Sequence, residues 1–271
     1  MTSREHLLLR IAPPSARPSR RVGYVLERNW LVYRKIWKLI IAGFFEPVFY
    51  LFAIGIGLGS LIGDLTLADG STVPYAAFVA PGMLAASAMN GAVYESTFNI
   101  FFKFKYGRVY QAMLATPLGS GDIALGEITW SLIRGLLYST AFLGVMALMG
   151  LATSWWALGA LGATLLIGLA FAAVGMAATT WMRSWQDFDL VTFVTLPLFL
   201  FSATFYPLEV YPPVIQSIAK LSPLYHGAEL VRSFTLGTFG PGMLTHVTVL
   251  VGMAVVGGAV AVNRLQRLLL A

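Results

Sequence analysis

Long apolar stretches alternate with short polar segments along most of the chain. A helix needs about 20 mostly apolar residues to cross the roughly 30 Å hydrocarbon core of a bilayer, and six stretches meet that requirement approximately. The uncharged stretch from Gly135 to Met182 would be about 72 Å long as one helix, so it must fold back as two spans. The predicted spans are residues 39–63, 73–99, 127–150, 155–182, 190–205 and 243–262.

Two segments outside these spans are amphipathic. In residues 20–38, apolar and aromatic side chains recur at steps of three and four, and cations occupy the other angles. This pattern predicts an interfacial helix that precedes the six-span domain of residues 39–262. Its apolar stripe comprises Val22, Leu26, Trp30, Tyr33 and Trp37. We expect residues 1–19 to be a flexible N-terminus and residues 263–271 to be a short C-terminal tail.

Composition supports an all-α polytopic membrane protein. Hydrophobic residues make up 58% of the chain and charged residues 11%, against about a quarter in a soluble domain, so a water-facing surface and disorder are both excluded. The chain has no cysteine, and its three histidines are too scattered to indicate a metal site by spacing. Half of the lysines and arginines precede residue 39, which indicates membrane topology rather than nucleic-acid binding. The charge distribution predicts that both termini are cytoplasmic.

Ionisable residues inside the spans are candidates for function, because burying charge in a membrane is costly. They are Glu46, Glu95, Glu127 and Arg134, all near the predicted inner ends of their helices. Structural pairing, for example of Arg134 with Glu95 or Glu127, and a role in gating are equally compatible with the pattern. No acid lies clearly at the membrane midplane.

Glycines in the first span do not form a nucleotide site. Gly55, Gly59 and Gly63 have the small-x-x-x-small spacing that allows another helix to approach closely. A dinucleotide fingerprint would need glycine where Ile62 stands, and no phosphate-binding loop of the Walker A type occurs. The chain is therefore not expected to bind ATP in that manner by itself.

Two connecting segments have patterns of their own. Residues 102–126 are amphipathic and basic, which suits a cytoplasmic helix packed on the membrane domain or on a second protein. The loop at 206–242 is proline-rich, and two apolar stretches in it predict short helices in the outer leaflet. His226, Glu229 and Arg232 follow at three-residue steps there, which favours a solvated or mutually paired cap over a substrate site.

Several short motifs resemble, in order and spacing, those of ABC-2 type permeases, particularly the branch of nodulation lipo-oligosaccharide and daunorubicin-type exporters. Together they cover most of residues 20–262. The motifs are Glu46-Pro-Val-Phe-Tyr-Leu, Phe78-Val-Ala-Pro-Gly-Met, Met89-Asn, Tyr94-Glu95-Ser, Leu114-Ala-Thr-Pro-Leu118, Gly126-Glu-Ile-Thr-Trp130, Phe201-Ser-Ala-Thr-Phe-Tyr-Pro207 and Leu221-Ser-Pro-Leu-Tyr-His226.

The resemblance implies that the membrane passage and the ATP-binding site belong to different chains. Such permeases pair as homo- or heterodimers and bind two copies of a separate ATP-binding subunit, which holds ATP and Mg²⁺, so no cofactor is expected in this chain. Residues 20–38 would be the elbow helix, and the 207–236 segment, beginning at Pro207, would cap the exit. The glycines at 55, 59 and 63 would pack in the dimer. Residues 106–117 would be the coupling helix, which would contact the ATPase through Tyr106, Arg108, Tyr110, Met113, Leu114 and Pro117.

These features predict the permease subunit of an exporter in the bacterial inner membrane. Its substrate would be an amphiphile, such as a drug, a glycolipid or a lipid-linked saccharide, and membrane lipid would surround it. One alternative is an ion-coupled carrier, which would normally have two related halves. Another is a membrane-embedded lipid-modifying enzyme, which needs clustered acids, histidines or metal ligands. We expect neither a catalytic residue nor a metal site in this chain.

Overall fold

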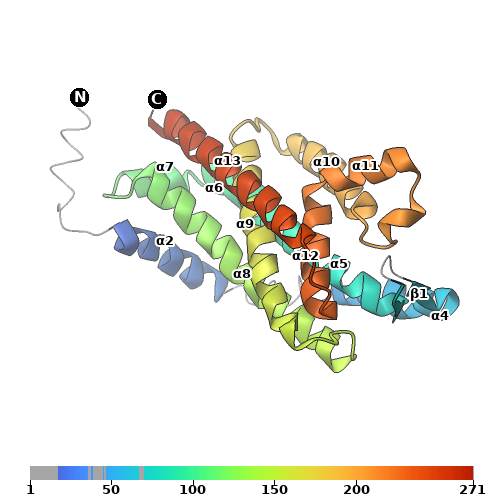
Figure 1. Cartoon of the computed structure of the whole chain (residues 1–271). Helices are drawn as coiled ribbons and strands as arrows, with labels where there is room; N and C mark the ends of the chain where they lie inside the picture. Colours follow the sequence, from blue (N-terminus) through green and yellow to red (C-terminus); the bar gives the residue numbers. More distant parts are fainter. Residues whose placement is uncertain (1–17, 36–37, 39–44, 46, 67–69, 271) are drawn as a thin grey trace.

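The computed structural model describes residues 18–35, 38, 45, 47–66 and 70–270 (Figure 1). Glu46 and part of the first predicted span lie outside the described residues. Four helical segments are long and apolar enough to cross a membrane. They are Tyr75–Lys105, Ser120–Leu148, Trp155–Thr179 and Gly242–Leu268, and they overlap the predicted second, third, fourth and sixth spans.

The other two predicted spans are shorter where the structure describes them. The described part of the first is the apolar helix Pro47–Ile62, and the fifth is α10 (Phe188–Phe201), of 14 residues. A 14-residue helix extends about 21 Å, less than the hydrocarbon thickness. The architecture is therefore mostly helical with several apolar helices, as expected for a polytopic membrane protein.

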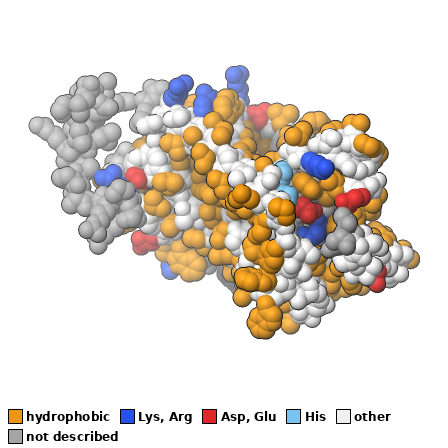
Figure 2. Space-filling model, viewed as in Figure 1, with side chains coloured by type: hydrophobic (Ala, Val, Ile, Leu, Met, Phe, Trp, Pro, Cys, Tyr) orange, Lys and Arg blue, Asp and Glu red, His pale blue; other side chains and the backbone are white. Residues whose placement is uncertain are grey.

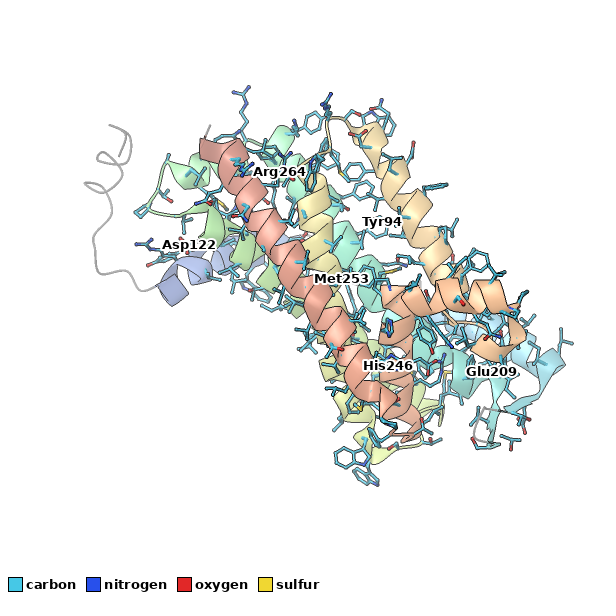
Figure 3. The ribbon with its side chains drawn as sticks, turned by 45° about the horizontal axis from the view of Figure 1, so that its top comes forward. Tyr94, Asp122, Glu209, His246, Met253 and Arg264 are labelled. Atoms are coloured by element: carbon cyan, nitrogen blue, oxygen red, sulfur yellow. The ribbon has the colours of Figure 1, made fainter. Side chains whose placement is uncertain are left out.

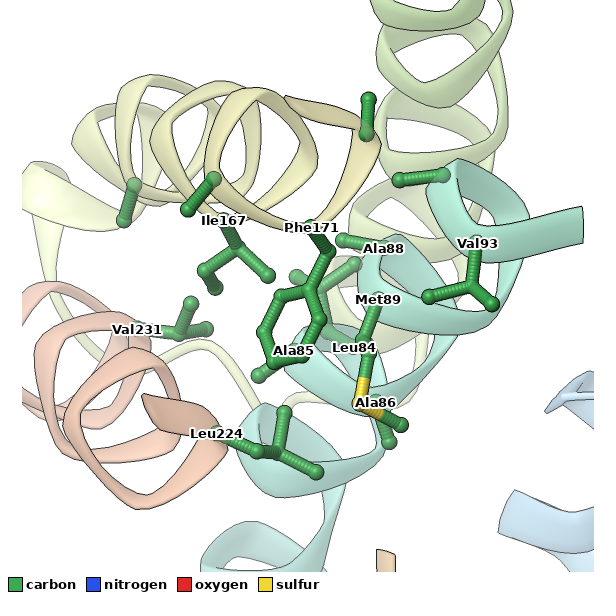
Figure 4. Packing of buried hydrophobic residues seen from close by; sticks show 14 of the residues in the cluster. Leu84, Ala85, Ala86, Ala88, Met89, Val93, Ile167, Phe171, Leu224 and Val231 are labelled. Atoms are coloured by element: carbon green, nitrogen blue, oxygen red, sulfur yellow. The ribbon is translucent and has the colours of Figure 1, made fainter. Parts of the chain in front are cut away.

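Helix α9 (Gly159–Thr179) occupies the centre of the bundle. It contacts α5 (Tyr75–Tyr94), α8 (Ser120–Leu148), α12 (Pro223–Leu236) and α13 (Gly242–Leu270). Figure 4 shows Ile167 and Phe171 of α9 between Leu84 and Met89 of α5 and the α12 side chains. Small residues allow these helices to approach closely. At the contact of α13 with α9, a Cβ added to Gly257 would lie only 2.9 Å from the backbone nitrogen of Val174.

Helix α2 (Pro18–Tyr33) includes most of the amphipathic segment predicted at residues 20–38. The residues that it buries in the protein are not the same as those of the predicted apolar stripe. Val25, Asn29 and Tyr33 are buried, whereas Trp30 is 60% exposed. The stripe was predicted to lie in the membrane interface, which the exposure of Trp30 does not contradict, but it did not include the buried Asn29. The buried asparagine is accommodated because α8 supplies a polar partner, as described below.

A short hairpin modifies the all-α expectation. Strands β1 (Asp64–Thr66) and β2 (Thr72–Pro74) pair antiparallel with Leu65 opposite Val73, in a segment expected to be only a polar loop. The first apolar helix ends just before it, at Gly63, whose φ of 77° is a left-handed conformation that suits glycine.

The surface of the described residues is largely apolar. Figure 2 shows hydrophobic side chains over much of the visible face, with lysines and arginines along its upper edge and others on the right of the view. Trp155 is 97% exposed and Leu148 is 90% exposed, at the turn between α8 and α9. Exposed apolar surface on this scale suits a protein that lies in lipid.

Candidate functional site

A wide helical turn places Glu95 inside the bundle. The helix that begins as α5 widens to π-helical geometry over Glu95–Asn99 and continues as α6 (Ile100–Lys105). The hydroxyl of Thr179 on α9 donates to the Ser96 carbonyl at 2.9 Å, and the Gly175 position leaves room for the Ser96 side chain. Such π turns often occur at functional sites, and this one directs Glu95 toward α8.

Glu95 is 7% exposed and forms an ion pair with Arg134 of α8. The Tyr33 hydroxyl of α2 donates to Glu95 Oε1 at 2.9 Å, and Arg134 Nη1 donates to the Tyr33 oxygen at 2.9 Å. Arg134 also donates to Tyr138 at 3.2 Å, while Asn99 donates to Glu95. Three separate helices therefore satisfy one buried carboxylate.

The guanidinium of Arg134 also lies over an aromatic ring. Its Cζ atom is 4.6 Å from the centre of the Tyr33 ring, a cation–π contact. Burial and the neighbouring carboxylate of Glu95 raise the pKa of Tyr33 well above its usual range. The phenol consequently keeps its proton at any physiological pH and remains a donor to Glu95.

A second ion pair lies farther along the same three helices. Lys103 Nζ is 2.7 Å from Glu127 Oε2, and Glu127 is 2% exposed. Asn29 of α2 donates to the same Glu127 oxygen at 3.1 Å and accepts from Lys103 at 3.2 Å. Asn29 and Tyr33 are one helical turn apart, so α2 connects both ion pairs.

A groove lies above the first of these pairs. Its volume is about 360 Å³, and side chains of the first apolar helix, α5, α8 and α10 line it. Glu95 and Arg134 form part of its floor, and Asn90, Ser87 and Thr192 add uncharged polar groups. The aromatic lining residues are Tyr50, Tyr94, Tyr138 and Phe199. The groove therefore offers apolar and polar surfaces to one molecule.

The predicted coupling residues lie in and around helix α7 (Val109–Leu114), and they form a buried group and an exposed group. Tyr110 is 1% exposed and Met113 is 8% exposed, so both face the protein's own core, and Leu114 is half-buried. Tyr106, Arg108 and Pro117 are exposed, and the same outward face includes Gln111 and Ala112. Only the exposed group is available to a partner.

Tyr110 points toward the second ion pair. Burial first, and then the carboxylate of Glu127, raise the pKa of the Tyr110 phenol. Among the described residues, neither the Tyr110 hydroxyl nor Glu127 Oε1 meets the geometry of a hydrogen bond. The Tyr110 phenol and the Glu127 carboxylate nevertheless interact electrostatically, while Lys103 and Asn29 hold the other Glu127 oxygen.

The three polar residues predicted to form a cap on α12, His226, Glu229 and Arg232, make separate contacts. Arg232 is 5% exposed, pairs with Glu229, and donates to the Ala203 carbonyl at 2.9 Å. Its Cζ atom is 4.0 Å from the centre of the Phe78 ring on α5. His226 does not join this pair and contacts His246 of α13 instead. Pro207 begins a turn at Leu208–Val210 and is half-buried.

The glycines of the first apolar helix face α5 of the same chain. A Cβ at Gly55 would lie 3.6 Å from Ala76 Cβ, and one at Gly59 would lie 3.6 Å from the Tyr75 ring. Gly63 has open space around it. Gly55 and Gly59 are therefore at ordinary contact distance from α5, and packing of the three glycines in a dimer stays a prediction.

Several members of the network were absent from the sequence-based set. Asn29, Tyr33, Lys103 and Tyr138 hold the two ion pairs together. In the sequence, the only indication of these members was Asn29, a polar residue beside the apolar residues of the amphipathic segment. Among the described residues no group of three histidine or acidic side chains is placed to hold a metal ion.

Comparison with known proteins identifies the family. The model of the ABC-2 type transporter family matches residues 20–236. Nodulation protein J of Sinorhizobium fredii is 37% identical over 249 residues, covering 91% of this chain and 93% of the relative. Nodulation protein J of Rhizobium meliloti is 34% identical, covering 84% of each chain. The inner membrane transport permease YadH of Escherichia coli is 25% identical, covering 80% of this chain and 86% of the relative. The chain belongs to the ABC-2 type transporter family and is a membrane transporter permease.

Proposed function

We propose that this permease exports an amphiphilic molecule from the cytoplasm or the inner leaflet, driven by a separate ATP-binding subunit. The observation that carries the proposal is the groove whose floor is the Glu95–Arg134 pair, because the pair belongs to a network that continues to the predicted coupling helix. The passenger would be a drug, a glycolipid or a lipid-linked saccharide, in keeping with the resemblance to lipo-oligosaccharide exporters.

The lining of the groove suits such a passenger. Glu95 and Arg134 neutralise one another, so the floor has no net charge to select an ion. Asn90, Ser87 and Thr192 provide hydrogen-bonding groups for a polar headgroup, and the aromatic rings provide apolar contact. A volume of about 360 Å³ falls within the range of small-molecule sites and would hold part of an amphiphile while its tail stays in lipid.

Coupling to ATP would pass through α7. Its exposed face, with Tyr106, Arg108 and Ala112, would sit against the ATP-binding subunit. Tyr110 would transmit displacement of α7 to Glu127 from inside the permease. Because α2 holds both Glu127 and Glu95, movement at one ion pair would be felt at the other and then in the groove. Nucleotide would thus shift the permease between inward-open and outward-open states.

The full assembly would contain two permeases and two copies of the ATP-binding subunit in the bacterial inner membrane. In this arrangement the first apolar helix and α10 complete the six spans, α2 is the elbow helix at the inner surface, and both termini are cytoplasmic. Segment 207–236 caps the outer side. The second permease is a copy of this chain or a paralogue.

The decisive experiment reconstitutes the purified chain in vesicles with and without a candidate ATP-binding subunit, such as one encoded beside it. We expect ATP hydrolysis that a panel of amphiphiles stimulates, and accumulation of the fitting amphiphile only when both chains and ATP are present. A matched ATP-binding subunit with its catalytic acid replaced is the control. Transport by the permease alone, driven by a proton gradient, would contradict the proposal.

A further inference from the structure

A pair of histidines connects α12 to α13, away from the polar network. His226 Nδ1 and His246 Nδ1 are 2.8 Å apart, and the ring centres are 5.1 Å apart. His226 is 8% exposed and His246 is half-buried. Figure 3 shows His246 on α13 where this helix passes the cap region, and Figure 2 shows histidines at the surface beside acidic and basic side chains.

This contact constrains the protons that the pair can hold. A neutral imidazole donates from one ring nitrogen and accepts at the other, while a charged imidazolium only donates. An Nδ1–Nδ1 hydrogen bond therefore needs one proton between the two atoms. The pair keeps its bond when it is neutral or singly protonated, but a second proton places two N–H groups and two positive charges face to face.

The surroundings of the pair add one aromatic and one acidic side chain. The Tyr225 ring centre lies 5.4 Å from that of His226 and 5.9 Å from that of His246. Glu229, one turn along α12, interacts electrostatically with His246, but its carboxylate is engaged by Arg232. Because Arg232 already engages the Glu229 carboxylate, Glu229 can offset only part of the repulsion between two protonated imidazoles.

The other packed helices offer little compensation. Helix α9 contains no ionisable residue, and the ionisable residues of α5 are Tyr75 and Tyr94, neither of which shifts His226. On α11 (Pro213–Leu221) the backbone of Lys220 favours protonated His226. Burial outweighs this contact and lowers the pKa of His226, so the neutral form prevails at pH 7.

The pair lies at the start of α12, which a contact between Ser222 and Ser202 also holds. Arg232 fixes the later half of the helix to α5 and to the chain around Ala203, through the contacts described above. The first turn holds His226 and the buried Leu224. Loss of the histidine contact would therefore weaken the attachment of the start of α12 to α13, while the Arg232 end stays in place.

We propose that His226 and His246 form a proton-sensitive clasp that holds the start of α12 against α13 and opens when both imidazoles are protonated. The clasp is closed at neutral pH, and it weakens as the pH falls below the ordinary histidine value of about 6.5 because the opened state binds more protons. Since α12 belongs to the proposed outer cap, acid on that side would loosen the exit. This last consequence rests on the proposed function, whereas the clasp itself does not.

Imidazole NMR of the full-length chain in nanodiscs tests the clasp directly. The chain has three histidines, so ¹⁵N-labelled histidine in a His6→Asn background reports only the pair. We expect two titration steps separated by more than about one pH unit, as for strongly coupled sites. In His226→Asn and in His246→Asn, the remaining imidazole should titrate in one step. Independent single-step titration of both imidazoles in the parent would overturn the proposal.

Hydrogen exchange supplies the mechanical readout. Protection factors, which remove the intrinsic effect of pH, should fall in residues 224–230 by up to about tenfold per unit as the pH falls from the ordinary histidine value of about 6.5 to the second protonation step of the pair. The double variant His226→Asn/His246→Asn stays uncharged and should show no such fall. An equal fall in the double variant would overturn the clasp, as would stoichiometric bound metal whose removal by a chelator alone changes the imidazole signals.

Discussion

At the scale of single residues, the buried charges of this permease are tolerated because each has a partner. Glu95 accepts from Arg134, Tyr33 and Asn99, so little of its charge is left unsatisfied in the bundle. Removing one member of such a pair is costly, because the other stays buried without compensation, whereas removing both can be nearly neutral.

We therefore expect Glu95→Gln to destabilise the permease by about 3 kcal/mol, the lower end of the range for breaking a buried pair, since Arg134 is partly exposed. The double variant Glu95→Gln/Arg134→Gln should recover much of the loss. Denaturant unfolding in detergent measures both, with Arg183→Gln at an exposed turn as the control. A double variant that is simply the sum of its single variants would argue against a direct pair.

Sequence could identify these residues but not assign their partners. Ionisable groups in apolar stretches are conspicuous, and pairing of Arg134 with Glu95 or Glu127 was among the expectations. In the structure Arg134 pairs with Glu95, and Lys103 pairs with Glu127. The choice depends on how the π turn at Glu95 rotates the helix beyond it, and no local sequence signal announces that turn. His246 likewise gains its role from the crossing of α12 and α13.

At the scale of elements, α2 is positioned by one close approach to α8. A Cβ at Gly126 would lie 2.6 Å from Val25 Cβ, far inside contact distance, so only glycine lets the two helices meet there. On α2 this contact lies one helical turn before Asn29, and on α8 it lies directly before Glu127. The spacing of the helices thus sets the geometry of the network.

Gly126→Ala should push α2 away from α8 and lower the thermal stability of the permease. Overpacking of this kind typically costs about 1–3 kcal/mol. Gly135→Ala in the same helix is the matched control, since a Cβ there meets nothing within 4 Å and should gain helix propensity. Thermal unfolding in detergent measures both. Equal stability of the two variants would show that α2 adjusts freely.

Most elements could be predicted from the spacing of apolar and polar residues. The long helices were found because a 20-residue apolar pattern has few alternatives in a membrane protein. The burial of Asn29 on α2 was not predicted, because it depends on a partner from α8 that the local pattern of apolar residues does not show. The hairpin at Leu65 and Val73 has only three pairs, too few to produce a strand pattern.

At the scale of the whole molecule, the proposed topology places α7 and the turn after α12 on opposite sides of the membrane. Ala112 lies on the exposed face of α7, and Thr238 is exposed beyond the end of α12. The two positions can be compared in a chain that has no native cysteine.

In intact cells, a membrane-impermeant maleimide should label Thr238→Cys, and it should label Ala112→Cys only after permeabilisation. Addition of the ATP-binding subunit should then protect Ala112→Cys alone, because only α7 would be covered. Thr238→Cys serves as the control for nonspecific shielding. Labelling of Ala112→Cys from outside would reverse the topology, and unchanged labelling after assembly would remove α7 from the docking surface.

The length of α8 has a mechanical consequence. Its 29 residues, Ser120–Leu148, extend about 43 Å, well beyond the hydrocarbon thickness of a bilayer. Its beginning adjoins α7 and carries Glu127, while its far end reaches the exposed turn before Trp155. Because α8 is continuous over this length, we expect it to carry a displacement at one end toward the other. A shift imposed beside α7 would emerge at the opposite membrane surface as a tilt.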